Sequence, residues 1–403
     1  MNKNPIALGV IGLGRAFTLM LPTFMQDQRI RLVAGTDPRA SARQLLQDEF
    51  GARAHNSAEA LCSDPEVELV YIASPHQYHM QHIRLAIAAG KHVLVEKPMA
   101  ISLAECHQIV DLVEQSKTTL IVGHSHSFNA PIRYASKLLQ SGRYGPVGMI
   151  NAINYTDFLY RPRRSDELNT ALGGGVVLSQ GAHQVDIVRL LAGGMVSTVQ
   201  ASTANWDAKR PTEGAYGALL RFENGAFATL TYSGYAHYDS DELMDNVSEM
   251  GYDKSSAGYG ARRAALAHVA SPDEEATLKQ NSVFGGPNFS LQQFDVAPWH
   301  QHFGPLIVSA AGADIRLTAS GLVIYDDTQR IVETLKTSSI PRVEVIDEVW
   351  AALRNGVAPL HDARWARATT EVCLAILESA STGQQQHLQF QVPTPASSVN
   401  NLP

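Results

Sequence analysis

The sequence predicts an α/β protein in which a doubly wound parallel sheet is followed by an α+β domain with an open, mainly antiparallel sheet. Three observations lead to this fold class. From residue 6 to 124, short apolar runs alternate with stretches of helical period. A glycine-rich turn follows the first run, and longer strands punctuated by Gly, Asn and Asp follow residue 126. Apolar strands separated by helices are typical of parallel sheets that are covered on both faces.

The first expected domain comprises residues 1–125 and contains five strands, IALGVIG, RLVAGTD, VELVYIAS, HVLVEK and TTLIVGH. Four helices are expected between them, from Arg15 to Asp27, Pro38 to Phe50, Gln77 to Ala89 and Ser102 to Ser116. The last helix opens with a serine that is followed three residues later by glutamate, which is the spacing of a capping box.

The second expected domain comprises residues 126–403. It starts with a helix from Ala130 to Leu139, the strand GMINAINY and a glycine-rich entry to the helix VVLSQGAHQVDIVRLLAG. Further strands follow, and two helices, Val343 to Arg354 and Trp365 to Ser381, close the domain. The polar stretch at about residues 238–298 is too long for an ordinary connection. We therefore expect it to be a lid or an oligomer contact.

Composition excludes several classes of protein. The net charge of -7 argues against nucleic acid as a partner, because binding to phosphates relies on clustered Lys and Arg. No segment reaches the roughly 20 apolar residues that cross a bilayer, and the N-terminus resembles no signal peptide. We expect a cytoplasmic protein without a membrane partner. Three distant cysteines, Cys62, Cys106 and Cys373, indicate neither a zinc site nor disulfides.

A dinucleotide site is predicted at the first strand, which ends in Gly9, Gly12 and Gly14 and passes directly into a helix. Such a turn places a phosphate against the free N–H groups of the helix. Asp37 ends the second strand, 23 residues past Gly14, where an acid accepts hydrogen bonds from the ribose hydroxyls. NAD is therefore the expected cofactor, on a Rossmann domain.

Two departures and one alternative accompany this prediction. Phe17 stands where the third small residue of the glycine pattern is usual, and Arg39 would tolerate the additional phosphate of NADP. Alternatively, the glycines only form a turn. The residues expected to contact the cofactor are Gly12, Gly14, Arg15, Ala16, Phe17, Asp37, Ser74, Pro75, His79, Glu96 and Lys97.

Two further strands end in polar motifs at the edge where an open α/β sheet binds its ligand. Ser74 and Pro75 end the third strand, and Glu96, Lys97 and Pro98 end the fourth. A lysine beside a nicotinamide ring can polarise an oxygen or relay a proton, so Lys97 is the first catalytic candidate. The alternative is a strand-end ion pair with Glu96.

The nearby histidines at positions 76, 79 and 82 recur every three residues. On a helix, this spacing turns the outer two about 120° apart, and no acid or thiol is interleaved, so we expect no metal. We expect the first two at the start of the helix near the cofactor, and the third to face solvent or packing.

In the second domain, Ser179, His183 and Asp186 follow at spacings of four and three on one expected helix. Imidazole is suited to accept a hydroxyl proton near neutral pH, and a carboxylate one turn away can orient it. His183 is therefore the second catalytic candidate. A buried histidine that is satisfied by its neighbour would give the same pattern.

These motifs in this order resemble the glucose-fructose oxidoreductase, inositol dehydrogenase and rhizopine catabolism family, over nearly the whole chain. The resemblance rests on the three N-terminal glycines, Glu96-Lys97-Pro98, Gly174-Gly175, and Gly181, His183 and Asp186. It implies a Rossmann domain followed by an open-sheet domain, a nicotinamide cofactor and a catalytic lysine at Lys97. The family's usual Asp four residues before the histidine is Ser179 here, which puts a diol-binding carboxylate in doubt.

Finer features, GHSHSFNAPI and LSQGAHQVDIVRLL, are similar to those of phthalate 4,5-cis-dihydrodiol dehydrogenases. This similarity implies a cyclic diol that bears carboxylates and is oxidised to a catechol. The run YRPRRSDE offers arginines that could bind carboxylates in bidentate fashion, although a solvated loop would look the same. The expected substrate contacts are His124, His126, Asn129, Arg161, Arg163, Arg164, Ser179 and His183.

Three other functions stay open. A sugar or inositol dehydrogenase of the same family would act on neutral polyols and would not need the arginine cluster. A glycosidase that keeps NAD bound would release a leaving group without net NADH. A catalytically silent nucleotide sensor is the third, because fold does not fix function. From the family resemblance we also expect a homodimer or homotetramer.

Overall fold

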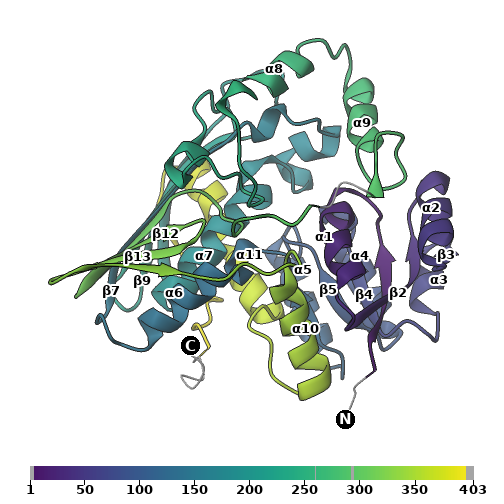
Figure 1. Ribbon diagram of the computed structural model, residues 1–403, viewed down its shortest axis with the longest axis horizontal. Coiled ribbons are helices and arrows are strands. Elements are labelled where there is room, and N and C mark those ends of the chain that lie inside the picture. The colour runs from purple at the N-terminus through teal and green to yellow at the C-terminus, as the bar shows by residue number, and fades with distance from the viewer. Residues whose placement is uncertain (1–3, 259, 292–294, 396–403) are drawn as a thin grey trace. The chain divides into compact units, whose positions relative to one another are not determined.

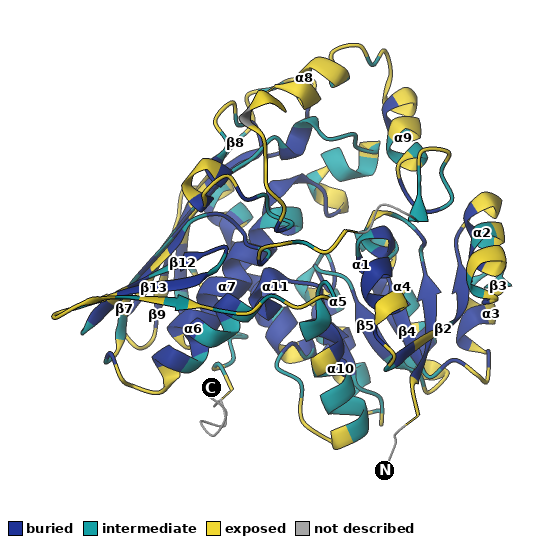
Figure 2. Ribbon diagram, viewed as in Figure 1, coloured by how far each residue is buried: buried dark blue, intermediate teal, exposed yellow. Residues whose placement is uncertain are grey.

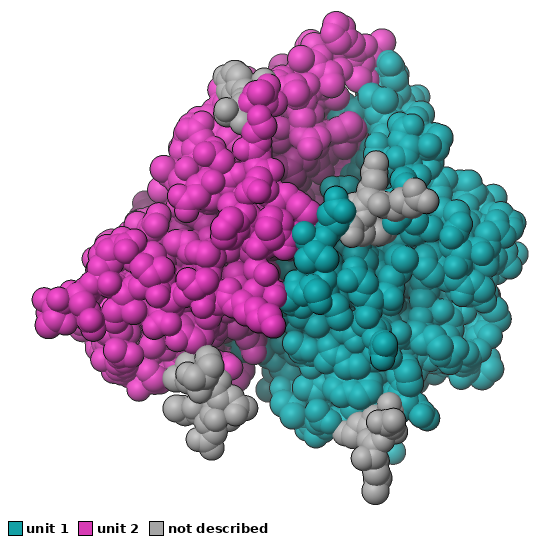
Figure 3. All heavy atoms as spheres, viewed as in Figure 1, with its two compact units in different colours: residues 1–124, 271–296, 338–370 teal, residues 125–270, 297–337, 371–403 magenta. Residues whose placement is uncertain are grey.

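The computed structural model describes residues 4–258, 260–291 and 295–395. The chain forms two compact units, which are coloured separately in Figure 3. Unit 1 comprises residues 1–124, 271–296 and 338–370, and unit 2 comprises residues 125–270, 297–337 and 371–403. Both units are therefore discontinuous in sequence. The division into contiguous domains, 1–125 and 126–403, stays a prediction.

The core of unit 1 is a six-stranded parallel sheet with strand order β3-β2-β1-β4-β5-β6 (Figure 1). The strands are β1 Ile6–Ile11, β2 Ile30–Thr36, β3 Arg53–His55, β4 Leu69–Ile72, β5 His92–Val95 and β6 Leu120–Val122. All six residues of β1 and all four of β4 are buried, because helices cover both faces of a parallel sheet. Figure 2 shows this sheet mostly in the dark blue of buried residues. The predicted Rossmann sheet is confirmed.

Helices of unit 1 connect these strands, and four of them follow the predicted helical periods, whereas strand β3 and the short helix at 58–62 were not predicted. The helices are α1 Arg15–Gln26, α2 Ala40–Phe50, α3 Ala58–Cys62, α4 His79–Ala88 and α5 Leu103–Glu114. The predicted serine cap is present at α5, where the Ser102 hydroxyl oxygen accepts from the Glu105 amide at 3.3 Å, but the Glu105 carboxylate accepts from the Ile101 amide, one residue before the capping-box position. Later segments also belong to unit 1, namely α9 Pro272–Asn281, α10 Val343–Asn355 and the first residues of α11 Ala363–Thr382.

Unit 2 is built on a nine-stranded sheet of order β14-β13-β12-β11-β7-β10-β9-β8-β15. Its strands are β7 Val147–Tyr155, β8 Val196–Ala204, β9 Ala215–Phe222, β10 Phe227–Ser233, β11 Leu306–Ala310, β12 Ala313–Thr318, β13 Gly321–Asp326, β14 Arg330–Thr334 and β15 Gln386–His387. Only the β7–β10 pair is parallel among the described strand pairs of this sheet. The predicted open, mainly antiparallel sheet is confirmed.

The remaining helices of unit 2 are α6 Ala130–Gln140, α7 Ala182–Ala192 and α8 Ala261–Leu266. The stretch at 238–298 divides between the units, because residues 271–296 belong to unit 1. Its role as a lid or oligomer contact stays a prediction. No helix in the described parts of the chain combines the length and apolarity needed to cross a bilayer. Cys62, Cys106 and Cys373 are buried free thiols.

Candidate active site

The turn between β1 and α1 requires glycine at one position and leaves space at another. Gly12 has a φ of +94°, and a Cβ there would lie 2.8 Å from the backbone of Ala73 and Ser74. Gly14 is the N-cap of α1, and a Cβ there would meet no heavy atom within 4 Å. Gly12 thus fixes the close approach of β1 to β4, whereas Gly14 keeps the helix N-terminus open for a phosphate.

Asp37 lies at the end of β2, and its carboxylate is already engaged within the unit. One oxygen accepts from the Leu13 amide at 2.8 Å, and the other accepts from the amide and the Nε of Arg39, both at 2.9 Å. Arg39 also donates to the carbonyl oxygens of Leu13 and Phe284. The acid and the arginine therefore form one buried assembly at the ribose end of the predicted site.

Phe17 points into the core of unit 1. It is fully buried and lies edge-on to Phe284, with ring centroids 5.1 Å apart. The Phe284 amide donates to the Thr18 hydroxyl oxygen at 3.0 Å, and a Cβ on Gly285 would lie 2.5 Å from Ala42. Residues 283–286 thus fill the space beside α1. Among the neighbours of Phe17 predicted to contact the cofactor, Arg15 is exposed and Ala16 is half-buried.

His79 joins the loops that follow β4 and β5. Its ring is fully buried, with Nδ1 2.9 Å from the Pro98 carbonyl oxygen and Nε2 2.9 Å from the Ser74 carbonyl oxygen. The Ser74 hydroxyl lies 2.9 Å from Nδ1 of His82, whose pKa burial lowers to about 4. Both ring nitrogens of His79 face backbone carbonyls. This residue therefore holds the two loops together, and its contact with the cofactor stays a prediction.

Lys97 and Glu96 follow β5, and their side chains have different surroundings. The Glu96 carboxylate accepts from the Tyr71 hydroxyl at 2.5 Å, and burial raises the pKa of this acid. Glu96 is therefore tied to β4. The charge of Lys97 opposes the effect of burial on Glu96, so the two side chains interact electrostatically. A strand-end interaction and a catalytic role for Lys97 are compatible in this geometry.

In unit 2, two aromatic rings lie against the predicted catalytic histidine. The centroid of the His183 ring lies 4.8 Å from that of His126 and 4.9 Å from that of Phe303. The His126 amide nitrogen lies 3.4 Å from Nδ1 of His183, a long contact. We call His126, Asn129, His183, Glu249 and Phe303 the histidine cluster. It brings together three of the predicted substrate contacts.

The helix predicted to carry Ser179, His183 and Asp186 is not regular at its start. Val177–Gly181 form a π-helical turn, and α7 begins only at Ala182. Ser179 is therefore displaced from the one-sided pattern that spacings of four and three would give on an α-helix. The Asp186 carboxylate accepts from the Ser127 hydroxyl, so it ties α7 to the segment after β6.

The glycine-rich entry to this helix accommodates a buried acid. Gly175 has a φ of +81°, and a Cβ there would lie 2.0 Å from the Glu213 carboxylate. That carboxylate accepts from the Val177 amide at 3.2 Å and from the Thr170 hydroxyl, while burial raises its pKa. Glu213 thus holds the start of the π-helical turn. Gly174 and Gly175 gave a signal for this close packing, but nothing in the sequence identified the acid.

The three predicted arginines have different surroundings. Arg163 is buried, stacks 3.6 Å from the Phe158 ring centroid and donates to the Phe158 carbonyl oxygen, and burial lowers its pKa to about 10. Arg164 pairs with Asp166 and Glu167. These two arginines hold their own loop. They are therefore weak candidates for carboxylate binding, although the predicted contact itself stays a prediction.

Arg161 is the best placed of the three for a ligand. Its side chain is 35% exposed, and Nε donates to Asp157 at 3.2 Å. Within the described part of the chain, no hydrogen bond reaches its two terminal nitrogens. Burial would lower the pKa of Arg161, but the charges of Glu249 and Asp157 raise it. The guanidinium group thus keeps two donors and a full charge near the histidine cluster.

The site contains groups that sequence reasoning missed. Glu249 lies in the stretch at 238–298 that was expected to be a lid or an oligomer contact, and Phe303 lies between that stretch and β11. A lone Glu in a polar stretch gives no signal for a contact with His126, which lies 123 residues away. His124 is buried, and its backbone bonds Glu96. No group of three or more His, Cys, Asp or Glu side chains suited to a metal occurs among the described residues.

Comparison with protein families gives two matches. The family described as oxidoreductase family, NAD-binding Rossmann fold, matches residues 6–124, and the GFO/IDH/MocA C-terminal domain matches residues 132–248. Together they cover more than half of the chain. The predictions of an oxidoreductase, of the family and of NAD as cofactor are confirmed.

Individual relatives agree with these matches. The 1-carboxy-3-chloro-3,4-dihydroxycyclo hexa-1,5-diene dehydrogenase of Comamonas testosteroni is 47% identical over 92% of this chain and 94% of its own. The trans-1,2-dihydrobenzene-1,2-diol dehydrogenase of Danio rerio is 28% identical over 57% of this chain and 67% of its own. A solved protein of Bordetella bronchiseptica RB50 is 36% identical, covers 95% of this chain and 100% of its own, and has a TM-score of 0.89.

Proposed function

Because the chain belongs to the glucose-fructose oxidoreductase, inositol dehydrogenase and rhizopine catabolism family of oxidoreductases, we propose that it oxidises a carboxylated cyclohexadiene diol to a catechol. The cis-4,5-dihydrodiol of phthalate, which yields 4,5-dihydroxyphthalate, is one such substrate. A second is 3,4-dihydroxycyclohexa-1,5-diene-1-carboxylate, the unchlorinated form of the diol named for the Comamonas testosteroni relative. Both carry two neighbouring hydroxyls and at least one carboxylate.

Bound NAD would supply the acceptor for the hydride that leaves the carbinol carbon. Lys97, in its neutral amine form, accepts the proton of the hydroxyl group on that carbon. His183 donates a hydrogen bond from Nε2 to the diol, because its Nδ1 faces the His126 amide and is the acceptor nitrogen of a neutral ring. Loss of the hydride and the proton leaves a dienone that tautomerises to an aromatic ring. This last step makes the oxidation effectively one-way.

The surroundings of Arg161 are the observation that best supports a carboxylate on the substrate. The partly exposed side chain of Arg161 has two terminal nitrogens directed to no acceptor among the described residues, and a planar fork of this kind binds carboxylates in bidentate fashion. A neutral polyol has no carboxylate for this planar fork to bind. A sugar or inositol dehydrogenase is therefore the second candidate, and the arginine argues against it.

The first test is NADH formation by the purified protein with four compounds. These are 4,5-dihydro-4,5-dihydroxyphthalate, 3,4-dihydroxycyclohexa-1,5-diene-1-carboxylate, the decarboxylated dihydrodiol and inositol. We expect turnover of one or both carboxylated diols and much slower turnover of the other two. Loss of this turnover in Lys97→Ala, with NAD binding retained, supports the assigned proton acceptor.

Other results would select a different function. Turnover of inositol alone discards the aromatic substrate and keeps the dehydrogenase. Cleavage of an aryl glycoside without net NADH identifies a glycosidase. Binding of NADH without turnover of any compound leaves the nucleotide sensor.

A further inference from the structure

Glu249 places a buried carboxylate against the ring of His126. Its Oε1 lies 3.2 Å from Nε2 of His126, and the Glu249 side chain is only 25% exposed. Burial would raise the pKa of Glu249, but the hydrogen bond from His126 and nearby positive charge, including that of Arg161, lower it to about 2. The group is therefore an ionised acceptor at neutral pH.

The neighbours of His126 define which of its nitrogens carries the proton. The Asn129 side-chain nitrogen donates to the Gln301 carbonyl oxygen at 2.8 Å, which fixes the orientation of the amide because a carbonyl only accepts. The second hydrogen of the same nitrogen points to Nδ1 of His126 at 3.0 Å. Nδ1 is therefore an acceptor, and Nε2 carries the hydrogen that is donated to Glu249.

The orientation of the His126 ring constrains that of the His183 ring, because the two rings pack together. The two rings are nearly perpendicular, at 75°, and the ring of Phe303 packs on both of them. The His126 amide approaches Nδ1 of His183 at 3.4 Å. A shift of the His126 ring would therefore move the surface against which the His183 ring packs.

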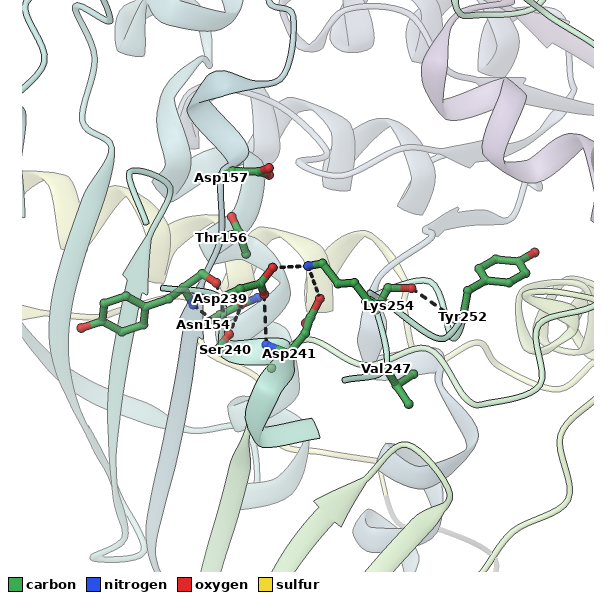
Figure 4. Close-up of polar contacts among 12 residues, drawn as sticks. Asn154, Thr156, Asp157, Asp239, Ser240, Asp241, Val247, Tyr252 and Lys254 are labelled. Atoms are coloured by element: carbon green, nitrogen blue, oxygen red, sulfur yellow. Dashed lines mark hydrogen bonds and ion pairs between the residues drawn. The ribbon is translucent and has the colours of Figure 1, made fainter. Parts of the chain in front are cut away.

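The hairpin that carries Glu249 is itself anchored, as Figure 4 shows. The Lys254 ammonium lies 2.7 Å from Asp241 and also bonds Asp239. The Ser248 amide donates to the Tyr252 carbonyl oxygen at 2.8 Å, which closes the hairpin. Gly251 has a φ of +84°, and a Cβ there would lie 2.3 Å from the Trp299 carbonyl oxygen. These contacts hold the backbone around Glu249 in one place.

We propose that Glu249 is a positioning residue for the dehydrogenase reaction, which fixes His126 in its Nε2–H form and thereby holds His183 in the orientation that meets the diol. This inference rests on the proposed function for its kinetic consequence. It assigns a task to a residue in the segment expected to be a lid or an oligomer contact. This chain has Ser179 where the family usually has Asp, and the carboxylate of Glu249 instead acts on His183 through His126.

The kinetic test compares three variants with wild type. Glu249→Ala removes the acceptor, and we expect kcat to fall about 100-fold, the cost of a misplaced catalytic group, while KM and the Kd for NAD stay within about threefold. Glu249→Gln keeps an acceptor for Nε2–H, and we expect it to recover most of kcat. Glu242→Ala removes an exposed acid of the same segment and should match wild type.

A spectroscopic test does not depend on turnover. Protein labelled with ¹⁵N-histidine is recorded in its NAD-bound form, and His126 is assigned by the signals lost in His126→Gln. We expect a protonated Nε2 and a bare Nδ1 at His126 in wild type and in Glu249→Gln, and a changed pattern in Glu249→Ala.

Each outcome decides the inference. A wild-type His126 protonated on Nδ1 overturns it even if Glu249→Ala does not fold, and so does a Glu249→Ala variant with wild-type kcat. If wild type oxidises none of the diols, the proposed function fails. The nitrogen spectra still decide whether Glu249 holds His126.

Discussion

The turn around Gly12 in unit 1 and the histidine cluster in unit 2 are assembled in different ways. Every residue that shapes the turn lies within one strand, one helix and the ends of two neighbouring strands. The histidine cluster draws on the segment after β6, on α7 and on the chain between β10 and β11. The first is therefore a local motif, whereas the second exists only after distant segments pack.

This difference separates two kinds of constraint. At Gly12, the backbone geometry itself excludes other residues, because φ is positive and the chain of β4 is close. His126 and Glu249 have no positive φ, so the backbone does not restrict these positions in this way, and their role follows from the proposed chemistry. We therefore expect substitutions in the turn to affect folding and NAD binding, and substitutions in the cluster to affect kcat.

The largest expected effect concerns Lys97, which follows a strand of unit 1 yet is assigned to the chemical step. Lys97→Ala should lower kcat about 10²–10⁴-fold, the usual contribution of an acid–base group. The Kd for NAD, measured by fluorescence, should change little. Lys117→Ala, which removes an exposed lysine from the same unit, is the control. A Lys97→Ala variant that retains half of the activity would remove it from the mechanism.

Substitutions of Gly12 and Gly14 should have different effects on thermal stability and on NAD binding. Gly12→Ala forces a Cβ to within 2.8 Å of the β4 backbone at a positive φ, so we expect a lower Tm and no NAD binding. Gly14→Ala meets no protein atom within 4 Å, so its Tm should stay near wild type while NAD binding weakens at least about tenfold. Calorimetry measures both quantities. Equal losses of Tm in the two variants would contradict the comparison.

A substitution of Arg161 tests whether unit 2 binds the carboxylate of the substrate. Arg161→Gln should raise KM for a carboxylated diol about 10- to 100-fold, because it removes a charge-assisted bidentate contact, and it should leave KM for the decarboxylated diol nearly unchanged. Arg164→Gln is the matched control, since Arg164 is paired with Asp166 and Glu167. Equal effects of Arg161→Gln on both diols would rule out a substrate carboxylate at this arginine.

The smallest expected effect concerns stability alone. Burial would raise the pKa of Asp64, but hydrogen bonds from Arg53, the Glu66 amide and His55 lower it from 3.8 to about 2. A depressed folded-state pKa stabilises the protein above pH 3.8, and the gain disappears as the pH falls through about 2.

Asp64→Asn should therefore lower the free energy of unfolding by about 1 kcal/mol at pH 7, allowing for solvent screening by the half-exposed Arg53. The difference from wild type should shrink toward pH 2 in denaturant titrations. Activity should not change. A difference that stays constant down to pH 2 would show that the charge of Asp64 is not its cause.

The sequence by itself determined the parallel sheet, the glycine turn, the acid at the end of β2 and the family to which these motifs belong. Each depends on residues that are neighbours in the chain or on the two-residue and 3.6-residue periods of buried elements. The same local rules located Lys97 and His183. They could not foresee the π-helical turn at Ser179, because that turn follows from the packing of Glu213 against Gly175.

Only the tertiary structure decided which side chains meet. It paired His126 with Glu249 across 123 residues, turned Arg163 onto Phe158, and left Arg161 partly exposed. It also assigned residues 271–296 to unit 1, where Phe284 packs beside Phe17. The physical reason is that backbone conformation is set by adjacent residues, whereas a contact between distant segments depends on how the whole chain packs.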